Sequence, residues 1–180
     1  PWNPQFLEEI SAYNCLRFMD WDTTNNSKRS KWSERNLKSA KAQNPVAYEW
    51  MIDLCNRVDA DMWVTLPHMI IDRNSGDAPS DYALRLCILV KTGVDMKEVD
   101  LAPFSGKMPE MTAEDFIAAG GEKTTEPLKE GLKFYIEYSN EIWSSGYSFP
   151  QGNWAQEQAD GLGISKAEFN ARRFCDIWHL

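Results

Sequence analysis

KFYIEYSNEIWSSG, residues 133–146, joins an aromatic run typical of a β-strand to the polar pair Asn140 and Glu141. Strand interiors disfavour both Asn and Glu, so the pair marks the end of a strand near 133–139. An amide and a carboxylate at a strand end are either ordinary solvated groups or groups placed for chemistry. The rest of the sequence separates these two readings.

Two earlier stretches of the sequence have a similar pattern. CLRFMDW at 15–21 and MWVTLPH at 62–68 are largely apolar runs of strand length that close on polar or aromatic residues. They predict parallel strands near 15–20 and 62–67. Helical patterns lie before, between and after the strands, at residues 4–13, 45–58, 80–92 and 153–178. This alternation is typical of an α/β fold with a parallel sheet.

Local signals predict where these helices begin and end. Asn44 and Pro45 are typical of an N-cap followed by the first helical position, and Val46, Trp50, Leu54 and Val58 then recur every four residues. The next helix has Ser80 as its cap, Ala83, Leu86, Cys87 and Val90 on one face, and Gly93 just past its end.

Residues 94–132 have the weakest pattern, with one capping-box sequence at 112–115 and a turn near 126–127. The chain has 180 residues, of which 43% are hydrophobic, and is long enough to bury a core. We expect a single domain, 1–180, with an irregular excursion at 94–132.

Composition argues against several classes of partner. The net charge is −8 and the pI is near 4.8, and clustered Lys and Arg for nucleic acid or an anionic membrane are missing. No apolar stretch reaches the roughly 18 residues of a membrane-spanning helix, and the N-terminus shows no signal peptide. No glycine-rich phosphate loop follows a strand, which weighs against a nucleotide cofactor.

A metal centre is not expected either. The four cysteines are far apart and form no C-x-x-C pair, and each lies in an apolar pattern, which predicts buried free thiols. Asp20 and Asp22 flank a tryptophan but form no ligand set by themselves.

Chemistry-bearing residues gather at the predicted strand ends. In parallel α/β folds the site lies at the carboxyl ends of the strands, in closed barrels and open sheets alike. The three strand ends and their loops carry Asp20, Trp21, His68, Asn140, Glu141 and Trp143. Glu137, four residues before Glu141, needs a partner if it is buried, and Arg17 is the natural one.

These features together resemble clan A of the retaining glycoside hydrolases, which are (β/α)8 barrels. YIEYSNEIW, with FPQGNWAQ after it, is similar to the fourth strand and following loop of a group of bacterial secreted glycosidases in that clan. LRFMDW and MWVTLPH then match the second and third strands. The resemblance covers about the first half of a TIM barrel and implies an extracellular or periplasmic enzyme that cleaves a polysaccharide or oligosaccharide.

The resemblance also implies roles for single residues. Glu141 takes the place of the general acid/base, and Asn140 that of the residue that binds the sugar 2-hydroxyl. The clan's nucleophile is a second Glu on the seventh strand, outside this chain, so the chain alone is expected to be inactive or to associate over its open sheet edges. The candidate substrate-binding residues are Asn140, Arg17, His68, Trp143, Trp21, Asp20 and Tyr147.

Retaining hydrolysis needs two carboxyl groups about 5 to 5.5 Å apart, and the acid needs a raised pKa. Burial among Tyr138, Trp143 and Tyr147 is the expected cause of that rise. Two alternatives stay open: a carbohydrate-binding barrel without catalysis, and another barrel enzyme, such as a lyase or aldolase, with Lys or metal ligands at the rim.

Overall fold

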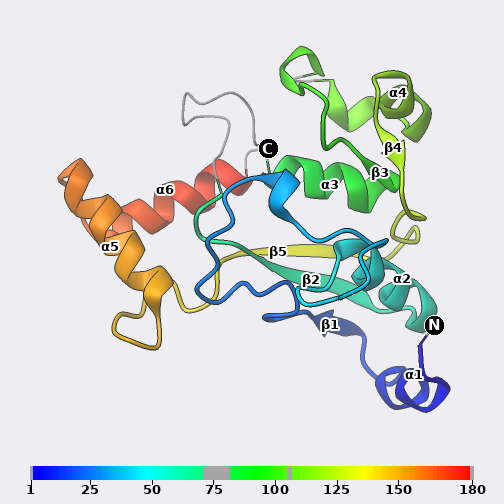
Figure 1. Cartoon of the computed structure of the whole chain (residues 1–180), viewed down its shortest axis with the longest axis horizontal. Helices are drawn as coiled ribbons and strands as arrows, with labels where there is room; N and C mark the ends of the chain where they lie inside the picture. Colours follow the sequence, from blue (N-terminus) through cyan, green and yellow to red (C-terminus); the bar gives the residue numbers. More distant parts are fainter. Residues whose placement is uncertain (1, 71–81, 105–106, 179–180) are drawn as a thin grey trace.

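The computed structural model describes residues 2–70, 82–104 and 107–178 (Figure 1). Six α-helices lie in this part of the chain: α1 (Pro4–Ile10), α2 (Tyr48–Val58), α3 (Tyr82–Thr92), α4 (Ala113–Ala118), α5 (Pro150–Leu162) and α6 (Lys166–Trp178). Three short 3-10 helices, η1 (Trp32–Glu34), η2 (Ala102–Phe104) and η3 (Met108–Glu110), lie in the connections. No helix of the described ranges has the length and apolar character needed to cross a membrane.

The main sheet has three parallel strands in the order β1-β2-β5. Their bounds are β1 (Cys15–Arg17), β2 (Asp61–Leu66) and β5 (Phe134–Tyr138). The predicted α/β class and the parallel direction of all three strands are thus confirmed. Across the described residues the sheet is open and closes no barrel (Figure 1).

β1 is shorter than the strand predicted near 15–20. Phe18 still donates its N–H to the Trp63 carbonyl (2.8 Å), but its ring turns into the core. Asp20 and Thr23 then have left-handed φ values of 63° and 58°, which extended backbone does not allow. The chain therefore leaves the sheet directly after Phe18.

The predicted start of α2 was wrong. The helix begins at Tyr48 with Ala47 as N-cap, not at Asn44 and Pro45. The preceding backbone is used elsewhere, because Val46 donates its N–H to the Trp21 carbonyl (2.8 Å) and Ala47 donates to Gln43 Oε1 (3.0 Å). The buried face consists of Tyr48, Glu49, Met51, Ile52, Leu54 and Cys55, so it shares only Leu54 with the predicted face.

Two other predicted helices differ from the structure in their bounds. α1 stops at Ile10 rather than near Tyr13, because Ser11 caps it by donating from Oγ to the Glu8 carbonyl (2.7 Å). The segment predicted as one helix at 153–178 is two helices, α5 and α6, separated at Gly163, whose φ is 68°. A residue without Cβ adopts this left-handed conformation at little cost, and it ends α5.

The end of α3 was predicted correctly, because Gly93 follows the helix with a φ of 73°. Of the predicted face, Ala83, Leu86 and Val90 are buried, whereas Cys87 is only half-buried. The helix is buried on most of its sides, not on this face alone. The predicted cap Ser80 and the loop before it lie outside the described residues.

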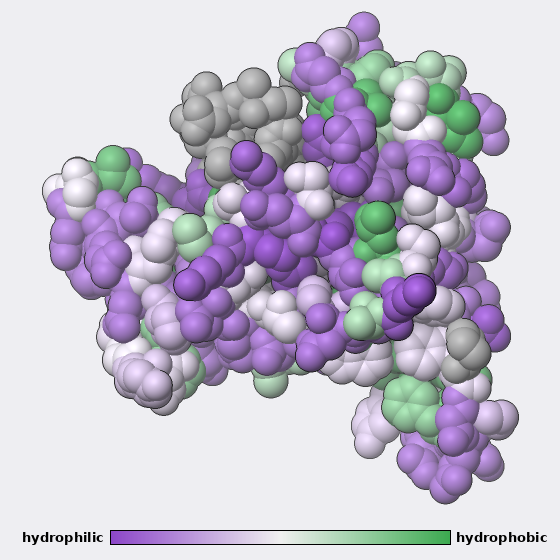
Figure 2. Space-filling model, in the orientation of Figure 1, coloured by the Kyte–Doolittle hydropathy of each residue, from purple (hydrophilic) through white to green (hydrophobic). Residues whose placement is uncertain are grey.

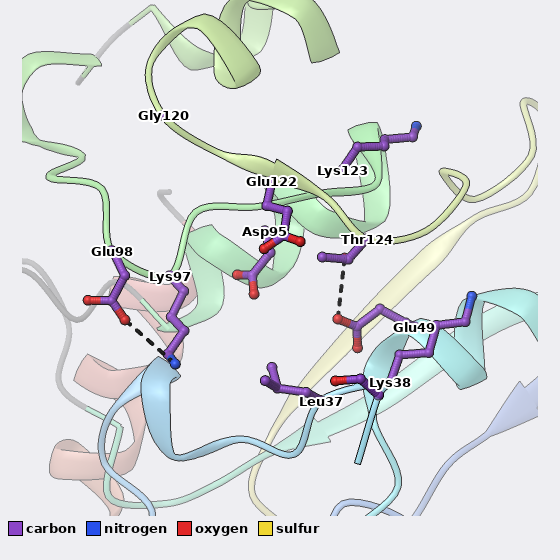
Figure 3. A pocket seen from close by; sticks show the side chains of 11 residues that line it. Leu37, Lys38, Glu49, Asp95, Lys97, Glu98, Gly120, Glu122, Lys123 and Thr124 are labelled. Carbon is purple, nitrogen blue, oxygen red and sulfur yellow. Dashed lines mark hydrogen bonds and ion pairs between the residues drawn. The ribbon is translucent and has the colours of Figure 1, made fainter. Parts of the chain in front are cut away.

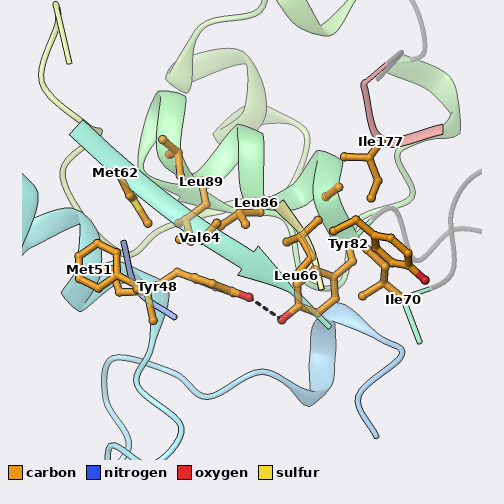
Figure 4. Packing of buried hydrophobic residues seen from close by; sticks show 14 of the residues in the cluster. Tyr48, Met51, Met62, Val64, Leu66, Ile70, Tyr82, Leu86, Leu89 and Ile177 are labelled. Atoms are coloured by element: carbon orange, nitrogen blue, oxygen red, sulfur yellow. Dashed lines mark hydrogen bonds between the residues drawn. The ribbon is translucent and has the colours of Figure 1, made fainter. Parts of the chain in front are cut away.

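The main core forms where β2 is covered by helices (Figure 4). Met62, Val64 and Leu66 alternate along β2 and are fully buried, as a strand with one covered face requires. Met51 of α2 and Leu89 of α3 are among the residues packed in the same cluster. In addition, α6 packs against β5 and α5 against α6.

Residues 94–132 are more ordered than predicted. β3 (Val94–Asp95) pairs antiparallel with β4 (Glu122–Lys123). Thr112 and Asp115 form the predicted capping box at the start of α4. A second hydrophobic cluster holds this segment together: Leu84, Ile88, Val94, Met96, Leu101, Met108 and Phe116.

The four cysteines are all free, as predicted. Cys55 is buried, and burial raises the pKa of its thiol to about 12. Cys15 and Cys87 are only half-buried, so the prediction of a buried thiol is confirmed for Cys55 alone. Cys175 is exposed, and the prediction was wrong there. It occurs on the outer side of α6, which the pattern at 153–178 did not resolve.

A buried ion network fixes the long connection between β1 and α2. Arg35 donates from Nη2 to Glu49 Oε1 (2.9 Å) and to Asp95 Oδ2 (2.6 Å), and its side chain is 1% exposed. Trp32 donates from Nε1 to Asp95 Oδ1 (2.7 Å) and lies under the Arg35 guanidinium at 4.5 Å. Two buried carboxylates thus share one guanidinium, which binds Glu49 in a bidentate manner.

We predict that Arg35→Met lowers the free energy of unfolding by about 3–5 kcal/mol, because Glu49 and Asp95 lose their cation inside the protein. Urea denaturation followed by tryptophan fluorescence measures this change. The matched control is Arg172→Met, which removes an exposed ion pair with Glu168 (2.7 Å) and should leave the midpoint unchanged. Equal midpoints for the two variants would contradict the assignment.

Candidate functional site

The face of the sheet opposite the core carries aromatic and charged side chains. Arg17, Trp63 and Tyr135 are aligned across the three strands. The Arg17 guanidinium lies 5.1 Å from the centre of the Trp63 ring, and the Trp63 and Tyr135 ring centres are 6.4 Å apart. Trp63 and Tyr135 are 37% and 42% exposed, so this face lies open in the described structure.

The predicted pair of Arg17 and Glu137 is confirmed. Arg17 donates from Nε (3.2 Å) and Nη2 (2.8 Å) to the same oxygen, Glu137 Oε2. The Glu137 side chain is 18% exposed and that of Arg17 37%, so the pair is half-buried rather than buried. Arg17 Nη2 also donates to Asn140 Oδ1 (3.3 Å), which links the sheet face to the end of β5.

Asn140 is held by side chains from three elements. Besides accepting from Arg17, it donates from Nδ2 to Asn25 Oδ1 (3.1 Å), in the connection after β1. Gln151, in the first turn of α5, donates to the Asn140 carbonyl (2.8 Å) and to Asn25 Oδ1 (3.3 Å). Because Gln151 is fully buried, this arrangement fixes the orientation of the Asn140 amide.

Asn25 and Gln151 are not among the residues that the sequence predicted for this site. Their only sequence signal is their position. Asn25 lies in the connection after a strand, and Gln151 lies in the first turn of the helix that follows the loop of Asn140 and Glu141. Neither position predicts a contact across more than 100 residues. The contact depends on how α5 docks beside the sheet.

Glu141 lies three residues past the end of β5, in a turn closed by the Ser144 N–H and the Glu141 carbonyl (3.0 Å). Ser139 and Glu141 have left-handed φ values of 56° and 50°, which cost energy for residues with a Cβ. The Glu141 side chain is half-buried, and its carboxylate has no hydrogen bond or ion pair within the described ranges. It is therefore not paired with any other side chain of the described structure.

The aromatic residues expected around Glu141 do not enclose it. Trp143 is 62% exposed and Tyr147 is fully exposed. Tyr138 is buried, but it points into the core and donates to the His68 carbonyl (2.7 Å). The predicted aromatic burial of the acid is thus absent from the described part of the chain.

His68 lies inside the protein rather than at an open rim. It is 4% exposed, and its ring meets Trp154 of α5 edge-on at 5.1 Å. Nδ1 has no hydrogen-bond partner among the described residues. Burial lowers the pKa of His68 to about 4, so the imidazole is neutral near pH 7.

Asp20 and Trp21 face a separate cavity of about 540 Å³ beside β1 and α2. Asp20 accepts the Asn25 N–H on Oδ1 (2.8 Å), and Trp21 packs edge-on against Phe18 at 5.0 Å. The loop that carries them therefore borders both this cavity and the Asn140 amide. The predicted rim residues thus lie in two neighbouring places: Asp20 and Trp21 face this cavity, and Asn140 and Glu141 follow the end of β5.

Asp22 is a buried structural acid. It accepts hydrogen bonds from Tyr48 and from Thr24 Oγ1 (2.5 Å), and Arg29 lies 3.2 Å away. Burial raises its pKa, and Arg29 opposes the rise. No group of three or more metal-ligating side chains occurs in the described ranges, Asp20 and Asp22 included.

A polar cavity of about 590 Å³ lies between the connection before α2 and the β3–β4 pair (Figure 3). Glu49 and Asp95 face it, but both form ion pairs with Arg35. Lys97 and Glu98 at its edge pair with each other at 3.6 Å. The buried carboxylates of this cavity therefore have partners within the fold, whereas the Glu141 carboxylate has none in the described chain.

We predict that His68 makes the protein less stable as the pH falls from about 6.5 to about 4. The unfolded histidine binds a proton near pH 6.5, whereas the folded one binds it only near pH 4, so stability is complete above this window and declines through it. Urea unfolding as a function of pH measures the slope. His68→Phe should reduce the slope in this window, and unchanged slopes would contradict a neutral buried imidazole.

Comparison with known proteins gives no relative to name. The chain matches no protein-family model, and searches of curated proteins and of solved structures also give no match.

Proposed function

We propose that this chain is part of a retaining glycoside hydrolase with Glu141 as general acid/base and Asn140 as the ligand of the sugar 2-hydroxyl. The observation that carries the proposal is the contrast at the end of β5. An unpartnered carboxylate follows an asparagine that three other side chains hold in place, two through its amide and Gln151 through its backbone carbonyl. The sequence resemblance to clan A supports the same assignment.

The unpartnered state of Glu141 suits a proton donor. Glu137 is neutralised by Arg17 at 2.8 Å, and Asp22 accepts two hydrogen bonds beside Arg29. The oxygens of these two carboxylates are thus occupied by partners within the protein. Those of Glu141 are not, so a glycosidic oxygen could contact this carboxyl group directly, as general acid/base catalysis requires.

Asn140 suits a sugar hydroxyl for a related reason. Its oxygen is occupied by Arg17 and one of its amide hydrogens by Asn25. The second hydrogen on Nδ2 remains to be donated, and its direction is set because the amide cannot rotate without losing both bonds. A preorganised donor of this kind stabilises a transition state more than a mobile one does.

In the proposed reaction Glu141 transfers its proton to the glycosidic oxygen while a second carboxylate attacks the anomeric carbon. The glycosyl–enzyme ester is then cleaved by water, which gives a proton back to Glu141. We place the second carboxylate on a further strand outside this chain. That strand would belong to a (β/α)8 barrel in which the open face with Trp63 and Tyr135 lines the interior.

The proposed substrate is a plant or algal polysaccharide or oligosaccharide, met outside the cytoplasm by an exported enzyme. The rival proposal is a barrel that binds glycan without cleaving it. The tryptophan-lined cavity beside Trp21 favours this rival, because aromatic faces bind sugars without chemistry. The two proposals differ in the effect of replacing Glu141.

We predict that Glu141→Gln, made in the complete enzyme that the proposal implies, lowers kcat on glycosides with poor leaving groups by roughly 10² to 10⁴. Activated aryl glycosides should be cleaved at a much less reduced rate in the first step, because their leaving groups need no proton. Steady-state and burst kinetics on the two kinds of substrate measure this.

The matched control is Glu157→Gln, an exposed glutamate of α5, which should leave both rates unchanged. Undiminished turnover of poor leaving groups by Glu141→Gln excludes the acid/base role. Glycan binding without turnover by the unchanged enzyme supports the rival.

We predict that Asn140→Ala lowers kcat/KM by about 10²-fold on the parent glycoside, because the bond to the 2-hydroxyl strengthens in the transition state. The same variant should cleave the corresponding 2-deoxy glycoside as fast as the unchanged enzyme does. A similar loss on both substrates would show that Asn140 acts on folding or on Glu141, not on the hydroxyl.

A further inference from the structure

We propose that the cavity beside β1 and α2 is a second sugar subsite that holds a neutral pyranose unit of a glycan. Trp2, Trp21 and Trp50 form its aromatic wall, and its volume is about 540 Å³. The identity of the glycan as the cleaved chain rests on the proposed function. The sugar-binding chemistry of the cavity stands on its own residues.

The aromatic wall is rigid. The Trp2 and Trp21 ring centres are 6.4 Å apart with planes inclined by 31°, and Trp2 meets Trp50 nearly at right angles at 6.1 Å. Trp2 is anchored by a hydrogen bond from Nε1 to Asp53 Oδ2 (2.6 Å). All three indoles are half-buried, so part of each remains open to a ligand.

Polar groups with unused hydrogen-bonding capacity surround this wall. The Asn44 amide is exposed, and the indole N–H groups of Trp21 and Trp50 have no acceptor among the described residues. Asp20 uses only Oδ1, for the Asn25 N–H. Donors and acceptors around an apolar floor match the hydroxyls around the apolar face of a pyranose.

The charges favour a neutral sugar over other flat ligands. The Lys38 ammonium lies 4.9 Å from the centre of the Trp50 ring, where a quaternary ammonium ligand would otherwise sit. The Asp20 carboxylate disfavours a uronate or a sulfated sugar, because it has no cation partner within the described ranges. A wholly apolar ligand would make no hydrogen bond with Asn44 or with the indole N–H groups of Trp21 and Trp50.

The cavity is connected to the proposed catalytic residues by one loop. Asp20 contributes to the cavity and binds the Asn25 N–H (2.8 Å), and Asn25 Oδ1 accepts from Asn140 Nδ2 (3.1 Å). The face shown in Figure 2 is mostly hydrophilic, with hydrophobic residues in small separate groups. The loop that carries Asp20 and Asn25 thus links the cavity to the amide of the residue before Glu141.

The test is a titration of the full chain with neutral oligosaccharides of glucose, mannose, xylose and galactose, read by tryptophan fluorescence and calorimetry. Trp21→Ala should weaken binding about tenfold or more, through lost stacking. Lys38→Met and Asn44→Ala test the polar contacts and keep the aromatic wall. Trp178→Ala, which removes a tryptophan that is 75% exposed outside the cavity, is the matched control and should bind as the unchanged chain does.

Binding that survives in Glu141→Gln and is lost in Trp21→Ala supports the subsite even if no hydrolysis is ever found, so the two proposals can fail separately. Equal affinity of Trp21→Ala and the unchanged chain overturns the subsite, as does an unchanged chain that binds none of these oligosaccharides. If Trp21→Ala is unfolded by circular dichroism, Lys38→Met and Asn44→Ala decide. Undiminished binding in both of them overturns the proposal.

Discussion

The long connection from β1 to α2 depends on one buried cation. This connection has little secondary structure of its own, yet it supplies Asn25 to the Asn140 amide and Asp20, Trp21 and Lys38 to the tryptophan cavity. Arg35 ties it to α2 through Glu49 and to β3 through Asp95. An interior ion network is a costly way to gain stability, but it allows few alternative positions for the loop. The geometry of both proposed sites therefore rests on a side chain that faces neither of them.

Four acids of this region show how environment divides one chemical group among different roles. Glu137 is paired with a cation, and Asp22 is buried under hydroxyl donors. Asp20 gives one oxygen to a backbone N–H, and Glu141 has no partner in the described chain. The sequence shows only four carboxylates near strand ends. Their neighbours, which come from distant segments, determine which one is left without a partner in the described chain.

Much of the sheet could be predicted because its signals are local. Apolar runs of strand length placed all three strands, and Gly93 and the Thr112 capping box marked helix ends that the structure confirms. The predictions failed where tertiary contacts compete with local preference. Val46 bonds to the Trp21 carbonyl and so delays α2, and left-handed Gly163 divides a segment whose hydrophobic pattern looked continuous.

The candidate site was also predicted only in part. The pairing of Arg17 with Glu137 followed from strand parity, which is a local rule. The enclosure of Glu141 by Trp143 and Tyr147 did not follow, because side chains in a loop obey no period. The contacts of Asn25 and Gln151 were not predicted either, because they depend on how α5 docks beside the sheet.

Gln151 has a consequence for how this region could change over time. It is a fully buried residue of a helix, and it touches both Asn25 and Asn140, which belong to loops on two different strands. The distance between these loops is thus set by α5 and not by the loops themselves. Either loop can gain or lose residues at its outer part and still return its asparagine to the same position. α5 therefore keeps the Asn140 amide in its position while the two loops, and the ligands that they bind, change in sequence.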